Sequence, residues 1–413
     1  MSVGGKGIPR MQDLSYLQVA IAEIRRGGTF DQVRRALVTR AADIDQENDI
    51  DGSFDERRWE RLRADGTKNV YNTVDVLKEL MRLGWVERAI LPSGPNSAYA
   101  HADTTFTLTA AGDAWGALAD VDRRAAYTDM VSVLIAAHPQ FDGYLRIVGC
   151  RPDSVSTNFT VPLLRYNPQQ HRTNQAYLDE FINFAVTATS STSLGWAATP
   201  GDIDAGIRSY VARIEARARA RGKELTRKQF GGSCEEALCR VAFAAAGCPT
   251  DYVTLEILRQ WTRFLGLANY SYYAPGPPAL RLWATADVSG ARPIAVERRV
   301  GNDVRRSALE AIWAAWTSLR SDGASGMYLP VWQLRAAVCW RQRISDDEFD
   351  RAIIEFLAGE HRDTGIEIHL DQASLRATPA STRPLIIPTT SGLRRRFNVI
   401  NVTQTTRTPK ENS

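Results

Sequence analysis

A helix, two strand-like segments around a polar loop and a second helix follow one another between residues 68 and 120. Apolar residues recur at helical spacing from residue 68 to 82, and the segment WVERAIL after Gly84 has the composition of a strand. A loop of Pro, Gly, Asn and Ser separates it from a second such segment, TTFTLT, which runs into AAGDAWGALAD. This order of elements predicts a small helical fold that carries a β-hairpin.

Two further helices are predicted before this region, over LSYLQVAIAEIRR and TFDQVRRALVTRAAD, and Thr29 can cap the second. Three helices followed by a two-stranded hairpin make a winged helix-turn-helix. The string LKELMRLGWVERAI…FTLTAAGDAW resembles the recognition helix, wing and following helix of bacterial winged-helix regulators, over about the first 120 residues. In this arrangement Leu108 packs under the wing, Thr109 caps the following helix, and Gly112 allows that helix to approach the sheet closely.

The resemblance implies a DNA-binding surface on the first domain. In such folds the third helix enters the major groove, and surrounding Lys and Arg side chains contact phosphates. The residues concerned are Lys68, Asn69, Asn72 and Tyr71 on the helix, and Arg57, Arg58, Arg61 and Arg63 in the basic segment before it. The alternative is that this is only the solvated face of a helix, and Asp75 and Glu79 favour that alternative.

The most basic stretch of the chain is IRSYVARIEARARARGKELTRK, residues 207–228. It is predicted as a helix with a thin apolar stripe and with its basic side chains on the outside. Phosphate is the natural partner of such a surface, which predicts DNA contacts for Arg213, Arg217 and Arg221. A solvated linker helix is the alternative.

A second winged-helix-like unit is predicted over residues 201–290, after a helical elaboration or linker over 126–200. ILRQWTRFLGLANYSYY matches VLKELMRLGWVERAI if one residue is inserted, because both run from a helix through Leu-Gly into a strand. Arg259 and Arg263 share the helix of this second copy and are predicted to contact DNA.

A third unit is predicted over residues 291–402, with the opposite charge. Its third helix begins at a Ser345-x-x-Glu348 capping box. Its exposed face is expected to show Asp346, Asp347, Asp350 and Glu355. Carboxylates repel DNA phosphates, so this unit is predicted to bind a protein partner or to pack on its neighbours. Residues 403–413 are predicted to form a flexible tail.

The predicted fold class is α+β and predominantly helical, with two to three tandem winged-helix domains, the first over residues 1–125, and small antiparallel wing hairpins. The 413 residues are 44% apolar and 24% charged, as in soluble globular proteins. The sequence holds no apolar run of about eighteen residues and no apolar leader, so no membrane contact and a cytoplasmic location are expected. Five cysteines without a CxxC pair are expected to be buried thiols.

No catalytic motif of the GxxxxGK, HExxH or GxSxG type is present, and the five histidines are scattered. The chain is therefore expected to be non-enzymatic, without a cofactor or a metal. The leading hypothesis is a binder of double-stranded DNA that acts in transcription, replication initiation, bacterial antiviral defence or DNA maintenance. The alternative is a non-catalytic adaptor subunit whose winged units dock proteins, which exposure of Trp332 and Trp340 would favour. Homodimer formation is left open.

Overall fold

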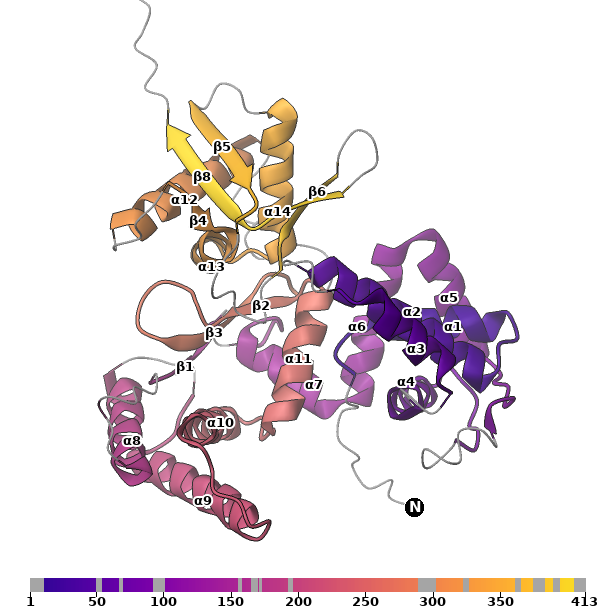
Figure 1. Ribbon diagram of the computed structural model, residues 1–413, viewed down its shortest axis with the longest axis horizontal. Helices are drawn as coiled ribbons and strands as arrows, with labels where there is room; N and C mark the ends of the chain where they lie inside the picture. The colour runs from indigo at the N-terminus through magenta and orange to yellow at the C-terminus, as the bar shows by residue number, and fades with distance from the viewer. Residues whose placement is uncertain are drawn as a thin grey trace, which may run out of the picture. The chain divides into compact units, whose positions relative to one another are not determined.

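The computed structural model is predominantly helical and carries small antiparallel sheets, as predicted (Figure 1). Its contacts divide the chain into one unit of residues 138–294 and another that combines residues 9–137 with 295–413. Measured over the described helices, none combines the length and apolar character that crossing a bilayer requires. The structure describes residues 11–49, 54–66, 70–91, 101–154, 158–164, 170, 173–191, 196–288, 302–321, 327–360, 365–373, 383–388 and 394–404.

The N-terminal region, residues 11–137, is a group of helices, and the segments between them form two isolated β-bridges. The bridges pair Thr29 with Thr105 and Val86 with Leu108, so the segment 105–108 lies between the other two. The predicted strands are reduced to these bridges, because beyond Val86 the side chains of Glu87, Arg88 and Ile90 are exposed. The helices are α1 (Ser15–Arg25), α2 (Phe30–Asn48), α3 (Glu56–Ala64), α4 (Val70–Arg82), α5 (Ala110–Val121) and α6 (Arg123–Ala137).

Local contacts in this region confirm three predictions. Thr29 caps α2 in a reciprocal capping box with Gln32. Thr109 caps α5 by accepting a hydrogen bond from the Gly112 amide at 3.1 Å. A Cβ added at Gly112 would lie 2.0 Å from the carbonyl oxygen of Trp85, so only glycine allows α5 to approach the strand this closely.

The second unit contains one three-stranded antiparallel sheet with the strand order β1-β3-β2. The last strand is the central one, since Leu282 of β3 pairs with Phe159 of β1 and with Tyr270 of β2. The elements are α7 (Pro139–Val148), β1 (Asn158–Pro162), α8 (Asn174–Ser191), α9 (Pro200–Arg219), α10 (Arg227–Ala245), α11 (Tyr252–Phe264), β2 (Ala268–Ser271) and β3 (Ala279–Ala284).

The predicted boundary at residue 200 therefore divides a single sheet. Strand β1 is five residues long, and its partner β3 begins more than a hundred residues later. No local pattern reports such a long-range pairing. Helix α7 and strand β1, which were predicted to be a linker, are the first two elements of this unit.

The C-terminal region repeats the antiparallel arrangement, with the strand order β4-β8-β5 and a separate two-stranded hairpin β6-β7. The predicted tail, residues 403–413, lies almost wholly outside the described residues, with Thr403 and Gln404 forming the end of β8. The elements are α12 (Asn302–Ser321), β4 (Leu329–Pro330), α13 (Val331–Gln342), α14 (Asp346–Glu355) with a further turn over Phe356–Glu360, β5 (Ile366–Asp371), β6 (Leu385–Pro388), β7 (Arg394–Phe397) and β8 (Val399–Gln404).

The same order of elements thus occurs three times along the chain: helix, short strand or bridge, helix, helix, strand, strand, with the last strand central. What differs is the inserted part. The first copy inserts α3 between its second and third helices. The second inserts α8 and α9 after its first strand, and the third inserts the hairpin β6-β7 before its last strand.

Candidate nucleic-acid interface

The basic stretch forms the end of a helical hairpin rather than one helix. Helix α9 ends at Arg219, and Gly222 turns the chain with φ 67°, a left-handed conformation that favours glycine. The Lys223 amide donates a hydrogen bond of 3.0 Å to the carbonyl of Ala218, which closes the end of α9. Thr226 and Gln229 then form a capping box that begins α10.

The two helices of this hairpin pack closely. Ile207 and Val211 of α9 are buried, as are Phe230 and Leu238 of α10. A Cβ added at Gly206 would lie 2.5 Å from the Cγ2 atom of Val241, so the helices approach to a distance that a larger residue would prevent. The exposed end of the hairpin is therefore held on a firm support.

Tyr210 of α9 links the two helices of the hairpin through polar contacts. Its hydroxyl donates a hydrogen bond to the carboxylate of Glu236, and the guanidinium groups of Arg213 and Arg240 lie 5.0 and 4.7 Å from its ring centroid. Burial, followed by the bond to Glu236, raises the pKa of Tyr210 to about 12. Glu236 and Arg240 were not predicted to take part, because the sequence shows only their own i,i+4 spacing and not their distance to Tyr210.

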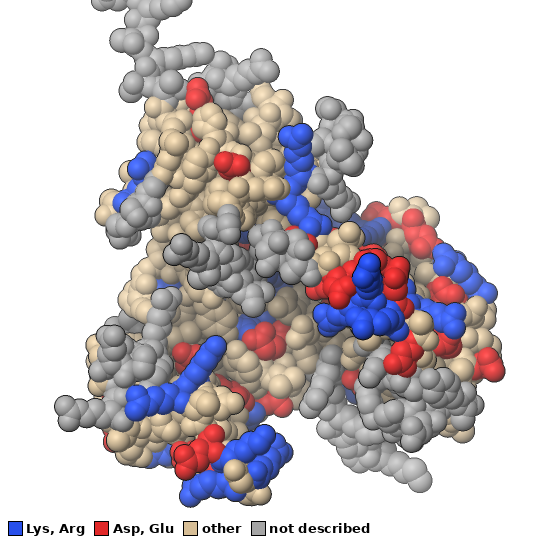
Figure 2. Space-filling view, viewed as in Figure 1, with Lys and Arg blue, Asp and Glu red and all other residues tan. Residues whose placement is uncertain are grey.

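Positive charge is concentrated at the end of the hairpin. Residues 213–228 contain seven basic and two acidic side chains, an excess larger than the net charge of +4 for the whole chain. Figure 2 shows Lys and Arg gathered there. No carboxylate of the described part of the chain forms an ion pair with the exposed Arg217, Arg219 or Arg221. By contrast, Arg208 near the middle of α9 is paired with Asp179 and Asp204 at 2.9 and 2.8 Å.

Helix α3 presents a second, weaker group of arginines. Arg57, Arg58 and Arg61 are exposed. The charge is diluted by neighbouring acidic residues, and Figure 2 shows Lys and Arg mixed with Asp and Glu over this helix. Arg63 is less available to bind phosphate than these three arginines, since it pairs with Glu56 at 2.8 Å.

Helix α3 is nevertheless firmly placed. The Trp59 indole nitrogen donates a 3.0 Å hydrogen bond to Asp45. The buried Arg34 donates to the carbonyls of Leu62 and Arg63 at 3.2 and 3.1 Å.

Helix α4 holds the predicted recognition position in the first copy. Asn72 and Lys78 are exposed there, Asp75 is half-buried and Glu79 is buried. Lys68 and Asn69 lie outside the described residues, as does the side chain of Tyr71. Of the residues predicted to face bases, Asn72 is thus the one whose exposure the structure establishes.

The prediction that Arg259 contacts DNA is wrong, because this side chain points inward. Arg259 is 1% exposed and forms an ion pair with Glu256, and its guanidinium lies 4.7 and 5.4 Å from the rings of Tyr270 and Tyr272. The Tyr272 hydroxyl accepts a 2.6 Å hydrogen bond from it. Arg263, one turn later, is half-buried and lies 5.7 Å from the ring of Tyr270.

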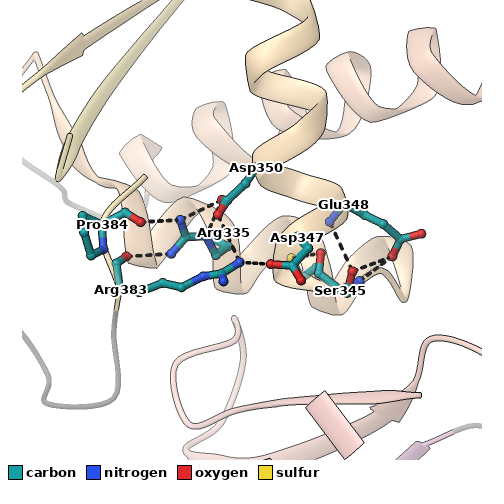
Figure 3. A network of polar contacts seen from close by, with 8 residues as sticks. Arg335, Ser345, Asp347, Glu348, Asp350, Arg383 and Pro384 are labelled. Carbon is teal, nitrogen blue, oxygen red and sulfur yellow. Dashed lines mark hydrogen bonds and ion pairs between the residues drawn. The ribbon is translucent and has the colours of Figure 1, made fainter. Parts of the chain in front are cut away.

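Of the four residues predicted to form an exposed acidic face in the third copy, Asp347 is exposed, whereas Asp346, Asp350 and Glu355 are half-buried. The Arg335 guanidinium donates to Asp350 at 2.7 Å, and Arg383 pairs with both Asp350 and Asp347 (Figure 3). Burial raises the pKa of Asp350, and the positive charges of the two arginines oppose that rise. Asp350 therefore does not belong to an exposed acidic surface.

Two further sequence expectations for the third copy have different outcomes. The Ser345 capping box is confirmed, with the Glu348 amide donating to the Ser345 hydroxyl at 3.2 Å. Trp332 and Trp340 are half-buried rather than exposed.

All five cysteines are buried, which confirms that part of the prediction. Burial raises the pKa of Cys234 and Cys239 to about 12 and that of Cys248 to about 11. In the part of the chain that the structure describes, no three His, Cys, Asp or Glu side chains are grouped so that they could hold a metal ion.

Comparison of the chain with protein-family models, with curated proteins and with solved structures found no match.

Proposed function

We propose that the chain is a non-enzymatic binder of double-stranded DNA, built from three winged-helix units, with the end of the α9–α10 hairpin as its main phosphate contact. The repeated order of elements supports the winged-helix assignment, because a central last strand paired with a short first strand is the arrangement of that fold. In this proposal α4, α11 and α14 occupy the third-helix position. They differ in what they expose, so the three units have different roles.

The observation that carries the proposal is the charge at the end of the hairpin. Seven basic side chains lie within sixteen residues on a well-packed support, and Arg217, Arg219 and Arg221 are exposed and form no ion pair with a carboxylate of the described part of the chain. DNA supplies a phosphate every few ångströms, and binding such a surface releases condensed counterions. A merely solvated surface gains nothing from clustering like charges, which repel one another.

The test is a binding titration of the full-length protein with a labelled duplex across a salt series, followed by fluorescence anisotropy. We expect the logarithm of the binding constant to fall linearly with the logarithm of salt concentration. Replacing Arg217, Arg219 and Arg221 by Ala is expected to weaken binding and to flatten the slope by about 0.9 for each phosphate that is no longer neutralised.

The matched control removes the same charge elsewhere, by replacing the exposed Arg124, Arg341 and Arg351 with Ala. The proposal requires the hairpin variant to lose more affinity than this control. Equal losses would show a general charge effect, and absence of wild-type binding at low salt would remove the DNA proposal.

A second role, protein docking by the third unit, is proposed for a different surface. Met327 and Leu357 are 65% and 40% exposed, and the carboxylates of Asp347 and Asp350 are both paired with Arg383. Replacing Met327 and Leu357 by Ser should leave DNA binding unchanged and reduce recovery of a partner in co-purification from the native cell.

A further inference from the structure

We infer that the α9–α10 hairpin lies across the phosphate backbone and outside both grooves of the duplex, so that this contact is independent of base sequence. The inference rests on the proposed DNA binding and specifies its mode. Three features of the hairpin carry it: the width of its end, the chemistry of the side chains there, and the charge at the start of α10.

The first feature is width. Two packed helices lie about 8–10 Å apart, and each is about 10–12 Å across with its side chains, so the end of the hairpin is roughly 20 Å wide. The major groove of B-DNA is about 12 Å wide and the minor groove about 6 Å. One helix fits the major groove, but two side by side do not. The close contact of Gly206 with Val241 and the Tyr210–Glu236 hydrogen bond hold the two helices together.

The second feature is the choice of side chains. From residue 216 to 221 the sequence is Ala-Arg-Ala-Arg-Ala-Arg, and Lys223, Arg227 and Lys228 complete the surface. No Asn or Gln, the side chains that pair with adenine in the major groove, occurs between residues 213 and 228. Gln229 is occupied as a cap, since its side chain accepts a hydrogen bond from the Thr226 amide at 2.9 Å.

The third feature is the charge at the start of α10. Arg227 and Lys228 occupy its first turn, where the positive end of the helix dipole disfavours cations. A phosphate placed there would offset the positive end of the dipole. This preference applies to the DNA backbone whatever the base.

The experiment compares the full-length protein with two variants on three duplexes of equal length, one A·T-rich, one G·C-rich and one mixed. In the first variant Arg217, Arg219 and Arg221 become Ala, which removes the charge. In the second the same residues become Lys, which keeps the positive charge that attracts phosphate but changes the donor geometry. Circular dichroism confirms that each variant is folded.

The Ala variant is expected to lose the same factor of affinity on all three duplexes, within about threefold, as phosphate contacts do. The Lys variant is expected to stay within about threefold of wild type on each duplex. For either variant, a loss at least tenfold larger on one duplex than on the others would overturn the inference while leaving DNA binding in place. If the wild-type protein binds none of the duplexes, the proposed function itself fails.

Discussion

At the scale of single residues, arginine has two opposite roles in this chain. Arg217 and Arg221 are exposed on the basic end of the α9–α10 hairpin, whereas Arg34, Arg259 and Arg335 are almost fully buried. Each buried arginine has a carboxylate partner, namely Asp31, Glu256 and Asp350 respectively. Burying a charge is costly unless it is paired and hydrogen-bonded, so these arginines belong to the fold and not to a binding surface.

The cysteines give a prediction at this scale. Because burial raises the pKa of Cys234 and Cys248 to about 12 and 11, their thiolate forms are scarce in the folded protein at pH 8. We expect a thiol reagent to label no cysteine of the native chain within minutes at pH 8, and all five in urea.

The same shifts predict how stability changes with pH. An unfolded thiol ionises near pH 8.5, below the pKa of the buried ones, so their contribution is fully present below that pH. It is lost as pH rises through the folded values. The free energy of unfolding should therefore fall between pH 8 and 11, as measured by urea titration. Rapid labelling of any native thiol would contradict the burial described above.

At the scale of elements, two buried arginines fasten insertions to the helices that carry them. Arg34 of α2 donates to the carbonyls of Leu62 and Arg63 at the end of α3. Arg335 of α13 donates to the carbonyl of Arg383 at 2.8 Å, just before β6. In both copies the arginine lies on the second helix of the repeat and ties down the part that distinguishes the copy from its neighbours.

Replacing Arg335 by Ala should therefore be strongly destabilising. It leaves the carboxylate of Asp350 buried with one fewer cation and leaves the Arg383 carbonyl without this donor, and breaking a buried pair in this way costs about 3–5 kcal/mol. Urea unfolding measures the loss. Arg351→Ala, at an exposed position on α14, is the control and should change stability by less than about 0.5 kcal/mol.

The double replacement Arg335→Ala with Asp350→Ala separates two explanations for that loss. If the cost comes from the unpaired carboxylate, the double variant should be more stable than Arg335→Ala alone. If the loss in the double variant equals the sum of the losses in Arg335→Ala and Asp350→Ala measured singly, the pair shown in Figure 3 has no interaction energy of its own.

Glycine 112 gives a second prediction for an element. A Cβ there would overlap the backbone of Trp85, so Gly112→Ala must push α5 away from the strand and break the stacking of Trp85 on Trp115, whose rings are 4.5 Å apart. We expect a loss of about 2 kcal/mol or more, since overpacking against backbone cannot be relieved by a rotamer change. Tryptophan fluorescence during urea unfolding reports it.

Gly232→Ala is the matched control. This glycine lies within α10, is exposed and has no heavy atom within 4 Å of an added Cβ. Alanine should raise stability there by about 0.5–1 kcal/mol, because it favours the helix. A neutral result at Gly112 would show that the close approach to Trp85 is not required.

The sequence predicted the elements better than their pairing. Amphipathic spacing, the caps at Thr29, Thr109 and Ser345, and the close approach at Gly112 are local signals, and each matches the structure. The pairing of β1 with β3 was not predictable, because it joins segments that are far apart in sequence.

Burial was equally hard to judge for single side chains. Arg259 and the basic residues of α9 both lie on amphipathic helices. Helical spacing alone does not show that Tyr270 and Tyr272, in and just after β2, cover Arg259, while the end of α9 stays exposed. The concentration of charge at residues 213–228 is visible in the sequence, but the turn at Gly222 that makes it a hairpin end was not predicted.

At the scale of the whole molecule, the repeats share an order of elements while their insertions supply the differences. The cationic surfaces proposed to contact DNA lie on the inserted α3 and on the hairpin that begins with the inserted α9. In the second copy the third-helix position is turned inward through Arg259. This arrangement favours backbone contacts from the insertions over base contacts from the repeated core.

The division of the chain gives the last prediction. Residues 138–294 contain a complete sheet, their own buried aromatic residues such as Trp261 and Phe243, and the whole α9–α10 hairpin. A fragment of these residues should therefore unfold cooperatively on heating, as followed by circular dichroism. It should also retain duplex binding, and replacing Arg217, Arg219 and Arg221 by Ala should remove that binding.

The salt slope of the fragment's binding to duplex DNA should be shallower than that of the full chain if α3 also contacts phosphate, since fewer counterions are released. Equal slopes would assign all the phosphate contacts to the hairpin, and a fragment without a cooperative transition would show that this unit needs the rest of the chain to fold.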